Sequence, residues 1–112
     1  MPVSESVQAL RDKYQKFHDT LADAREKCTQ PADRARLREL AEAIQDVLTA
    51  LDQADMQSRT AEFEALSQQI GAANSDLERL KAEINTIVQD EKCAQKVVSA
   101  IDACLTASAK VF

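Results

Sequence analysis

A heptad repeat runs through the second half of the chain. Two series of positions, offset by three residues and each repeating every seven, are mostly apolar: Met56, Phe63, Ile70, Leu77, Ile84, Glu91, Val98, Leu105 and Phe112, and Arg59, Leu66, Ala73, Leu80, Ile87, Ala94, Ile101 and Ser108. Apolar residues spaced alternately by three and four form one stripe along a helix, and that stripe must pack against another helix. The repeat therefore predicts a chain built from packed helices.

The composition supports the same fold class. The 112 residues include one glycine and two prolines, and a sheet would need turn residues at much shorter intervals. Nineteen residues are alanine and none is tryptophan, so the core should be thin and made of close helix contacts. The length is that of one domain. We therefore predict an all-α fold and a single helical domain over residues 1–112.

Two local signals predict where the helices end. Pro31 cannot donate a backbone hydrogen bond and disfavours helix at the residue before it, but it suits the first turn of a new helix. Gly71 resembles a helix C-cap, and Ser75 with Glu78 matches a capping box. The favoured prediction is three helices, over residues 5–28, 32–70 and 76–110. They would form an antiparallel three-helix bundle with coiled-coil-like packing, in which the last two make a helical hairpin.

A second arrangement remains open because the heptad keeps its phase straight through Gly71. The apolar stripe instead thins between residues 52 and 62. In this alternative a corner near residues 52–58 separates a helix over 32–54 from one long helix over 58–110. That long helix would extend about 40 Å beyond its partners and would require a second chain, such as a dimer mate, to cover it.

The C-terminal segment 94–112 is unusually apolar, with twelve apolar residues among nineteen. A helix that is apolar beyond one stripe is either buried on several sides or contacts another chain. The sequence leaves both alternatives open. The candidate residues for an apolar partner interface are Val97, Val98, Ile101, Cys104, Leu105 and Phe112.

The charge pattern suggests a protein partner. The net charge is −5, and residues 31–70 carry most of the excess. The candidate acidic surface consists of Glu39, Glu42, Asp46, Asp52, Asp55 and Glu62. Such a surface would attract a basic partner and set the association rate more than the affinity. An acidic chain without a basic block argues against nucleic acid. The cluster Arg34, Arg36 and Arg38 has two interpretations: salt bridges to the first helix, or a docking patch for an acidic partner.

No motif indicates chemistry. His18 is the only histidine, and the three cysteines, Cys28, Cys93 and Cys104, lack metal-ligand spacing. We therefore predict no enzyme activity, no metal and no cofactor. No signal peptide or apolar run of membrane-spanning length is visible, and the odd number of cysteines suits a reducing compartment, so the predicted location is the cytoplasm without membrane contact.

These observations lead to two hypotheses about function. The first is a non-enzymatic protein-binding module, comparable to toxin-neutralising immunity proteins or secretion chaperones, which are also small, acidic and helical. The alternative is a self-associating coiled-coil subunit of a scaffold. The sequence contains no motif that selects either one.

Overall fold

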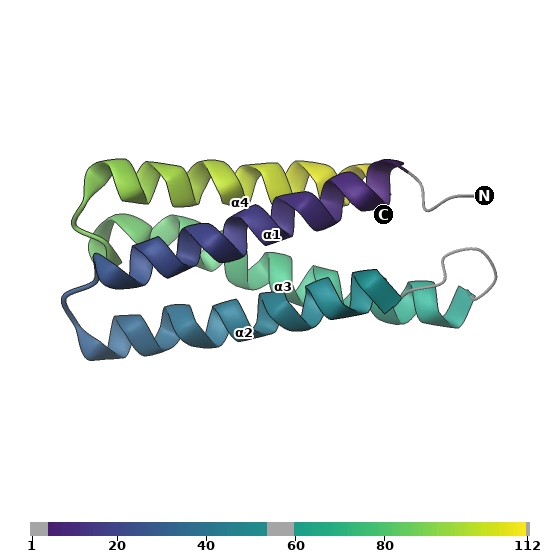
Figure 1. Ribbon diagram of the computed structural model, residues 1–112, viewed down its shortest axis with the longest axis horizontal. Coiled ribbons are helices and arrows are strands. Elements are labelled where there is room, and N and C mark those ends of the chain that lie inside the picture. Colours follow the sequence, from purple (N-terminus) through teal and green to yellow (C-terminus); the bar gives the residue numbers. More distant parts are fainter. Residues whose placement is uncertain (1–4, 54–59, 112) are drawn as a thin grey trace.

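The structure is a computed structural model that describes the backbone of residues 5–53 and 60–111 and the side chains of residues 8–52 and 64–110. Within these ranges it contains four α-helices: α1 (Glu5–Glu26), α2 (Pro31–Gln53), α3 (Thr60–Ile87) and α4 (Glu91–Val111). Successive helices run in opposite directions along one bundle (Figure 1). The all-α prediction is confirmed, and the predicted number of three helices is wrong.

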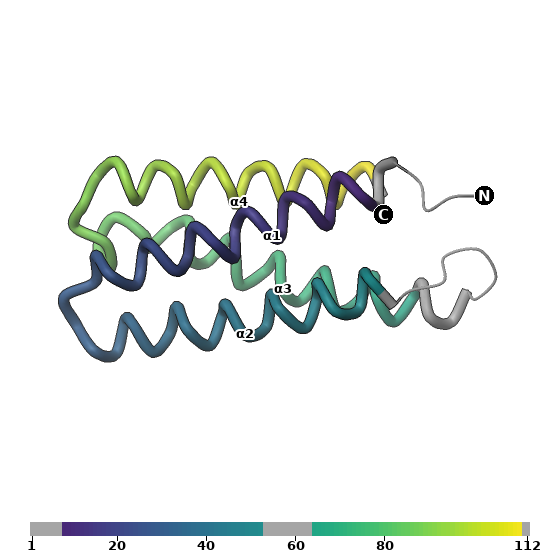
Figure 2. The backbone as a smooth tube through the Cα atoms, in the orientation of Figure 1, coloured from purple at the N-terminus to yellow at the C-terminus, as the bar shows by residue number. Residues whose placement is uncertain are grey.

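The helices form a closed ring of neighbours. Helix α1 packs against α2 and α4, and α3 packs against the same two helices. The connections α1–α2 and α3–α4 are short and lie at the same end of the bundle (Figure 2). At that end Cys28 and Val88 form an isolated antiparallel backbone bridge. Each helix can therefore bury one stripe against two neighbours. The buried side chains are mostly leucine, isoleucine and other residues larger than alanine, so the expected thin core of alanine contacts is wrong.

The predicted turn after Gly71 is wrong. Gly71 and Ser75 both lie inside α3, and the Ser75 hydroxyl donates a hydrogen bond to the Gly71 carbonyl 3.2 Å away. This bond to the residue four positions back belongs to a helix interior rather than to a capping box. On the same stripe Ile70, Ala73 and Leu77 are buried. Their burial outweighs the cost of about 1 kcal/mol for one glycine inside a helix.

The chain breaks instead at residues 88–90, which neither predicted arrangement included. Asp90 precedes α4, and its carboxylate accepts a hydrogen bond from the Cys93 amide at 3.0 Å. An aspartate in this place is a helix N-cap. The alternative arrangement anticipated α2 with a helix over 32–54, but its long helix over 58–110 is divided into α3 and α4.

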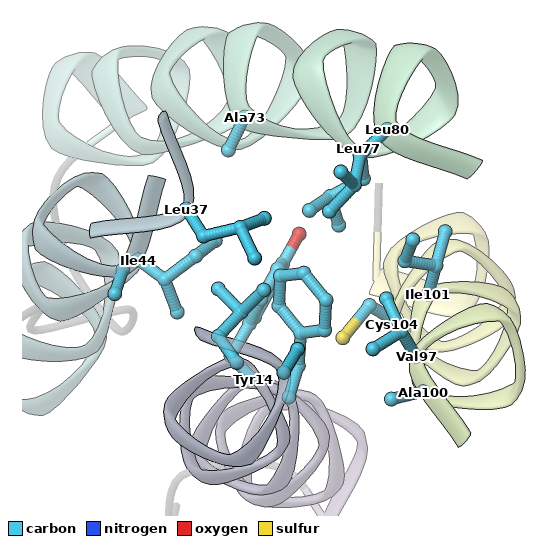
Figure 3. Packing of buried hydrophobic residues seen from close by; sticks show 14 of the residues in the cluster. Tyr14, Leu37, Ile44, Ala73, Leu77, Leu80, Val97, Ala100, Ile101 and Cys104 are labelled. Carbon is cyan, nitrogen blue, oxygen red and sulfur yellow. The ribbon is translucent and has the colours of Figure 1, made fainter. Parts of the chain in front are cut away.

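The core combines an apolar cluster with a buried polar contact between helices. Buried side chains from all four helices converge on the interior, and around Tyr14 they include Leu37, Ile44, Leu77, Leu80, Val97, Ile101 and Cys104 (Figure 3). The Tyr14 hydroxyl donates a hydrogen bond to Asn74 on α3 and lies 3.1 Å from the hydroxyl of Ser108 on α4. This contact links three helices, and burial raises the pKa of Tyr14 to about 12.

Candidate functional site

The structure places the predicted apolar interface mainly inside the bundle. Val97, Ile101 and Cys104 have no exposed side-chain surface, and they face the core (Figure 3). Val98 and Leu105 are half-buried against the same core. Phe112 lies outside the described residues. The wide apolar face of α4 therefore packs against α1 and α3, so three of the six predicted residues offer no surface to a partner in this fold.

The predicted acidic surface is partly assembled. Glu39, Glu42 and Asp46 are exposed along the outward side of α2, at helical spacing. Asp52 is also exposed, but it forms an ion pair with Arg11 of α1, and this pair lowers the pKa of its carboxyl group. The side chains of Asp55 and Glu62 lie outside the described residues. We call Glu39, Glu42 and Asp46 the acidic face of α2.

The arginines at the start of α2 have different roles. Arg34 donates a hydrogen bond to the Cys28 carbonyl at 2.9 Å and so closes the α1–α2 corner. Arg36 forms an ion pair with Glu83 of α3, not with the carboxylates of α1 that the first interpretation required. Arg38 is exposed, and together with Arg25 and Arg34 it lines a shallow hollow of about 370 Å³.

The most distinctive surface feature is a furrow between α1 and α4. It consists of two hollows with volumes of about 670 and 480 Å³, which share Lys13 and Ala103. Five of the seven lysines in the chain line these hollows: Lys13 and Lys16 on α1, and Lys92, Lys96 and Lys110 on α4. Small side chains lie between them, including Thr20 on α1 and Ala100, Ala103 and Ala107 on α4. We call this feature the lysine furrow.

The charges of the lysine furrow are not neutralised by the part of the chain that the structure describes. All five lysines are exposed, and none forms an ion pair with a described carboxylate. One carboxylate, Asp102, borders the furrow, but it pairs with Lys81 of α3 at 2.7 Å. Unpaired like charges in one furrow repel each other, and an anion placed among them would relieve that repulsion.

The sequence contains signals for each side of this furrow but not for the whole. Lys13 and Lys16 share a helix face because they are three residues apart, and Lys92 and Lys96 do so because they are four apart. Joining the two pairs requires knowing that α1 lies beside α4. In the first and last thirds of the chain, basic and acidic residues are nearly equal in number. Charge counts along the sequence therefore do not reveal that the lysines cluster in the fold.

Groups with possible chemical roles are few and separate in the described residues. His18 is half-buried, and its Nδ1 lies 3.7 Å from a carboxylate oxygen of Asp19. The three cysteines are buried and unpaired. Burial raises the pKa of all three thiols, that of Cys104 to about 12, which disfavours the nucleophilic thiolate.

Two kinds of feature are absent from the described residues. They contain no group of three or more histidine, cysteine or carboxylate side chains placed to hold a metal ion. Among the same residues no helix combines the length and the apolar character needed to cross a bilayer.

Comparison with known proteins gives no match: no family model fits the chain, and no curated protein or solved structure is significantly similar to it. The candidate site therefore stands on geometry and charge alone.

Proposed function

We propose that this chain is a non-enzymatic protein-binding module that docks through its charged exterior. The observation that supports this function is a pair of local clusters of like charge on the bundle. Carboxylates form the acidic face of α2, whereas lysines gather in the furrow between α1 and α4. Immunity proteins that neutralise toxins and chaperones that accompany secreted proteins would use such a surface, and we propose a role of this kind.

The acidic face of α2 is suited to a basic protein partner. Glu39, Glu42 and Asp46 follow one side of the helix over about 10 Å at 1.5 Å per residue. In the described residues none of the three pairs with a basic side chain. Exposed, unpaired carboxylates steer a basic partner during diffusion, so this face should mainly control the association rate.

The test begins with capture of the partner from cells that make this chain, followed by kinetic measurement of the purified pair. The triple variant Glu39→Gln, Glu42→Gln, Asp46→Asn removes the acidic face. The matched control Glu64→Gln, Asp76→Asn, Glu78→Gln removes three exposed carboxylates from α3. We expect the association rate at low salt to fall at least tenfold for the first variant and less than twofold for the control. Equal effects, or no effect, would remove the acidic face from the proposal.

A self-associating scaffold with coiled-coil-like packing is the second candidate function. One observation favours it: the acidic face of α2 in one copy is complementary in charge to the lysine furrow of another. Because such a contact is head-to-tail, it would build a ring or a filament. Light scattering at about 20 mM and 500 mM salt tests this, since the assembly should dissociate as screening increases. A monomer at both salt concentrations would eliminate the scaffold.

A further inference from the structure

We propose that the lysine furrow between α1 and α4 binds an acidic helical segment of a partner protein. This binding site is separate from the acidic face of α2 and does not depend on a partner docking there. The inference combines three observations about the furrow: its length, its small side chains and its unpaired positive charges.

The length of the furrow corresponds to a helix of about five turns. Lys92 lies in the first turn of α4 and Lys110 in its last turn. Their separation of eighteen residues corresponds to about 27 Å at 1.5 Å per residue. On α1, Lys13 and Lys16 form the opposite rim along the same furrow. A linear ligand of this length could therefore meet positive charge on both sides.

The floor of the furrow allows a helix to approach closely. Ala100 is buried, Ala103 and Ala107 are half-buried, and Thr20 contributes the floor on the α1 side. Helices pack by placing the side-chain ridge of one into the groove of another, and small residues in the groove shorten the distance between their axes. The lysine stems can then cover the sides of the incoming helix while their ammonium groups reach its carboxylates.

The charges define the chemistry of that helix. Five exposed ammonium groups without described carboxylate partners favour glutamate or aspartate on both flanks of the ligand. The side that enters the furrow should carry alanine or another small residue, because alanine methyl groups line the floor together with the small polar side chains of Thr20, Ser99 and Thr106. The expected partner is therefore an acidic amphipathic helix.

The same observations disfavour nucleic acid and membranes as occupants. The furrow contains no arginine for bidentate base contacts and no aromatic side chain for base stacking. Along the outward side of α1 the exposed carboxylates of Asp12, Asp19 and Asp23 would repel a long phosphate chain. The hollow is also concave, whereas a membrane-binding surface needs apolar side chains that project into the lipid.

The experiment uses the full chain and a synthetic probe. The probe is a helical peptide of about twenty residues with an alanine stripe flanked by glutamates. The reference peptide has glutamine in place of every glutamate. Binding is followed by backbone amide NMR shifts. We expect the glutamate peptide to bind at least tenfold more tightly than the glutamine peptide. The shifts should concentrate at Lys13, Lys16, Ser99 and Ala103, and the affinity should fall as salt is added.

Two matched variants separate the furrow from overall charge. The furrow variant carries Lys13→Gln, Lys16→Gln, Lys92→Gln and Lys96→Gln. The control carries Arg25→Gln, Lys27→Gln, Arg38→Gln and Arg79→Gln, which removes the same number of positive charges outside the furrow. Circular dichroism of both variants should match that of the original chain. We expect at least a tenfold loss of peptide affinity in the furrow variant and less than a threefold loss in the control.

Four results would overturn the proposal. Equal binding of the two peptides would show that the furrow does not recognise carboxylates, and equal losses in the two variants would show attraction by overall charge alone. Tighter binding to a twenty-residue oligothymidylate or to phosphatidylserine vesicles would indicate a phosphate ligand instead. Self-association that blocks the peptide would identify a second copy as the occupant. The first three results do not bear on the acidic face of α2, which is tested with a different partner. Self-association would instead support the scaffold, in which the acidic face of α2 in one copy enters the lysine furrow of another.

Discussion

Replacing Gly71 with alanine should stabilise the protein. Gly71 lies in the interior of α3, and it is exposed and does not have a positive φ angle. Apart from its chain neighbours and the backbone of its own helical turns, a Cβ atom built on Gly71 would meet no atom within 4 Å. Alanine can therefore adopt the same conformation without a clash. The substitution also reduces the conformational freedom of the unfolded chain, which a glycine makes large.

The expected gain is about 1 kcal/mol in the free energy of unfolding, the usual difference between alanine and glycine inside a helix. For a domain of this length such a gain corresponds to about 4 °C in the melting temperature. Urea denaturation followed by circular dichroism measures the free energy, and calorimetry measures the melting temperature. The dependence of the free energy on urea should stay the same, because the surface buried on folding does not change.

Ala72→Gly is the matched control for this prediction. Ala72 is the next residue of the same helix and is also exposed. Its replacement should cost about the 1 kcal/mol that Gly71→Ala gains. If Gly71 instead occupied a left-handed helix cap, alanine would destabilise the protein and Ala72→Gly would have little effect. That opposite pattern would refute a continuous α3 and restore a turn at residues 71–75.

Three further predictions concern the core and the cap of α4. Ile101→Asp should unfold the chain, at a cost of several kcal/mol for a buried charge; a folded species of smaller mass in light scattering would mean that Ile101 lies in an interface. Burial raises the pKa values of Tyr14 and Cys104 to about 12, from ordinary values of 10.0 and 9.0. The protonated groups therefore contribute their full stability below those ordinary values, and this contribution is lost as the pH rises towards 12. Urea titrations between pH 8 and 11 should show this loss, and Cys104→Ala should reduce it. Asp90→Ala should lower the melting temperature, because it removes the acceptor for the Cys93 amide. Asp90→Ser should retain most of the stability of the original chain, because the serine hydroxyl can also cap the helix. Since the same hydrogen bond lowers the Asp90 pKa, its contribution should disappear as the pH falls below about 4.

The first corner of the fold was predictable because its cause is local. Helix α1 ends at Glu26 and α2 begins at Pro31, close to the predicted ends at residues 28 and 32. Proline imposes this boundary through its own ring and missing amide, and no tertiary contact can restore the amide. The buried residues of α1, which include Tyr14 and Phe17, follow the same spacing of three and four residues, and this signal is also local.

The remaining helix boundaries depend on competition between weak local signals and burial. The signal at Gly71 was strong in sequence, but the packing of Ile70, Ala73 and Leu77 keeps the helix intact. The signal at Asp90 was weak, because residues 88–90 contain neither glycine nor proline. The heptad gave no warning of this break, since Ile87 and Ala94 are both buried and keep the seven-residue spacing across it.

The apolar face of α4 was visible in sequence, but what covers it was not. Burial on several sides and contact with a second chain require the same residues, so composition cannot separate them. The choice depends on the number of helices. With four helices in a closed ring, α4 has two neighbours, α1 and α3, and these bury Val97, Ile101 and Cys104. The sequence therefore identified the apolar residues of α4 but left open whether another helix of the chain or a second chain covers them.

The lysine furrow shows why net charge is a poor guide to the partner of a small bundle. A net charge of −5 suggests a basic partner, yet charges act on a ligand only over about 8 Å at physiological salt. The two short axes of the bundle measure 21 and 19 Å. A carboxylate ligand among the lysines of α1 and α4 would therefore be largely screened from the acidic face of α2 across the bundle. It would be held by the local cluster of ammonium groups, whose members come from opposite ends of the sequence. The sign of the surface charge at a binding site depends on which helices are neighbours there. A chain whose net charge is negative can therefore offer a favourable site to an acidic helix.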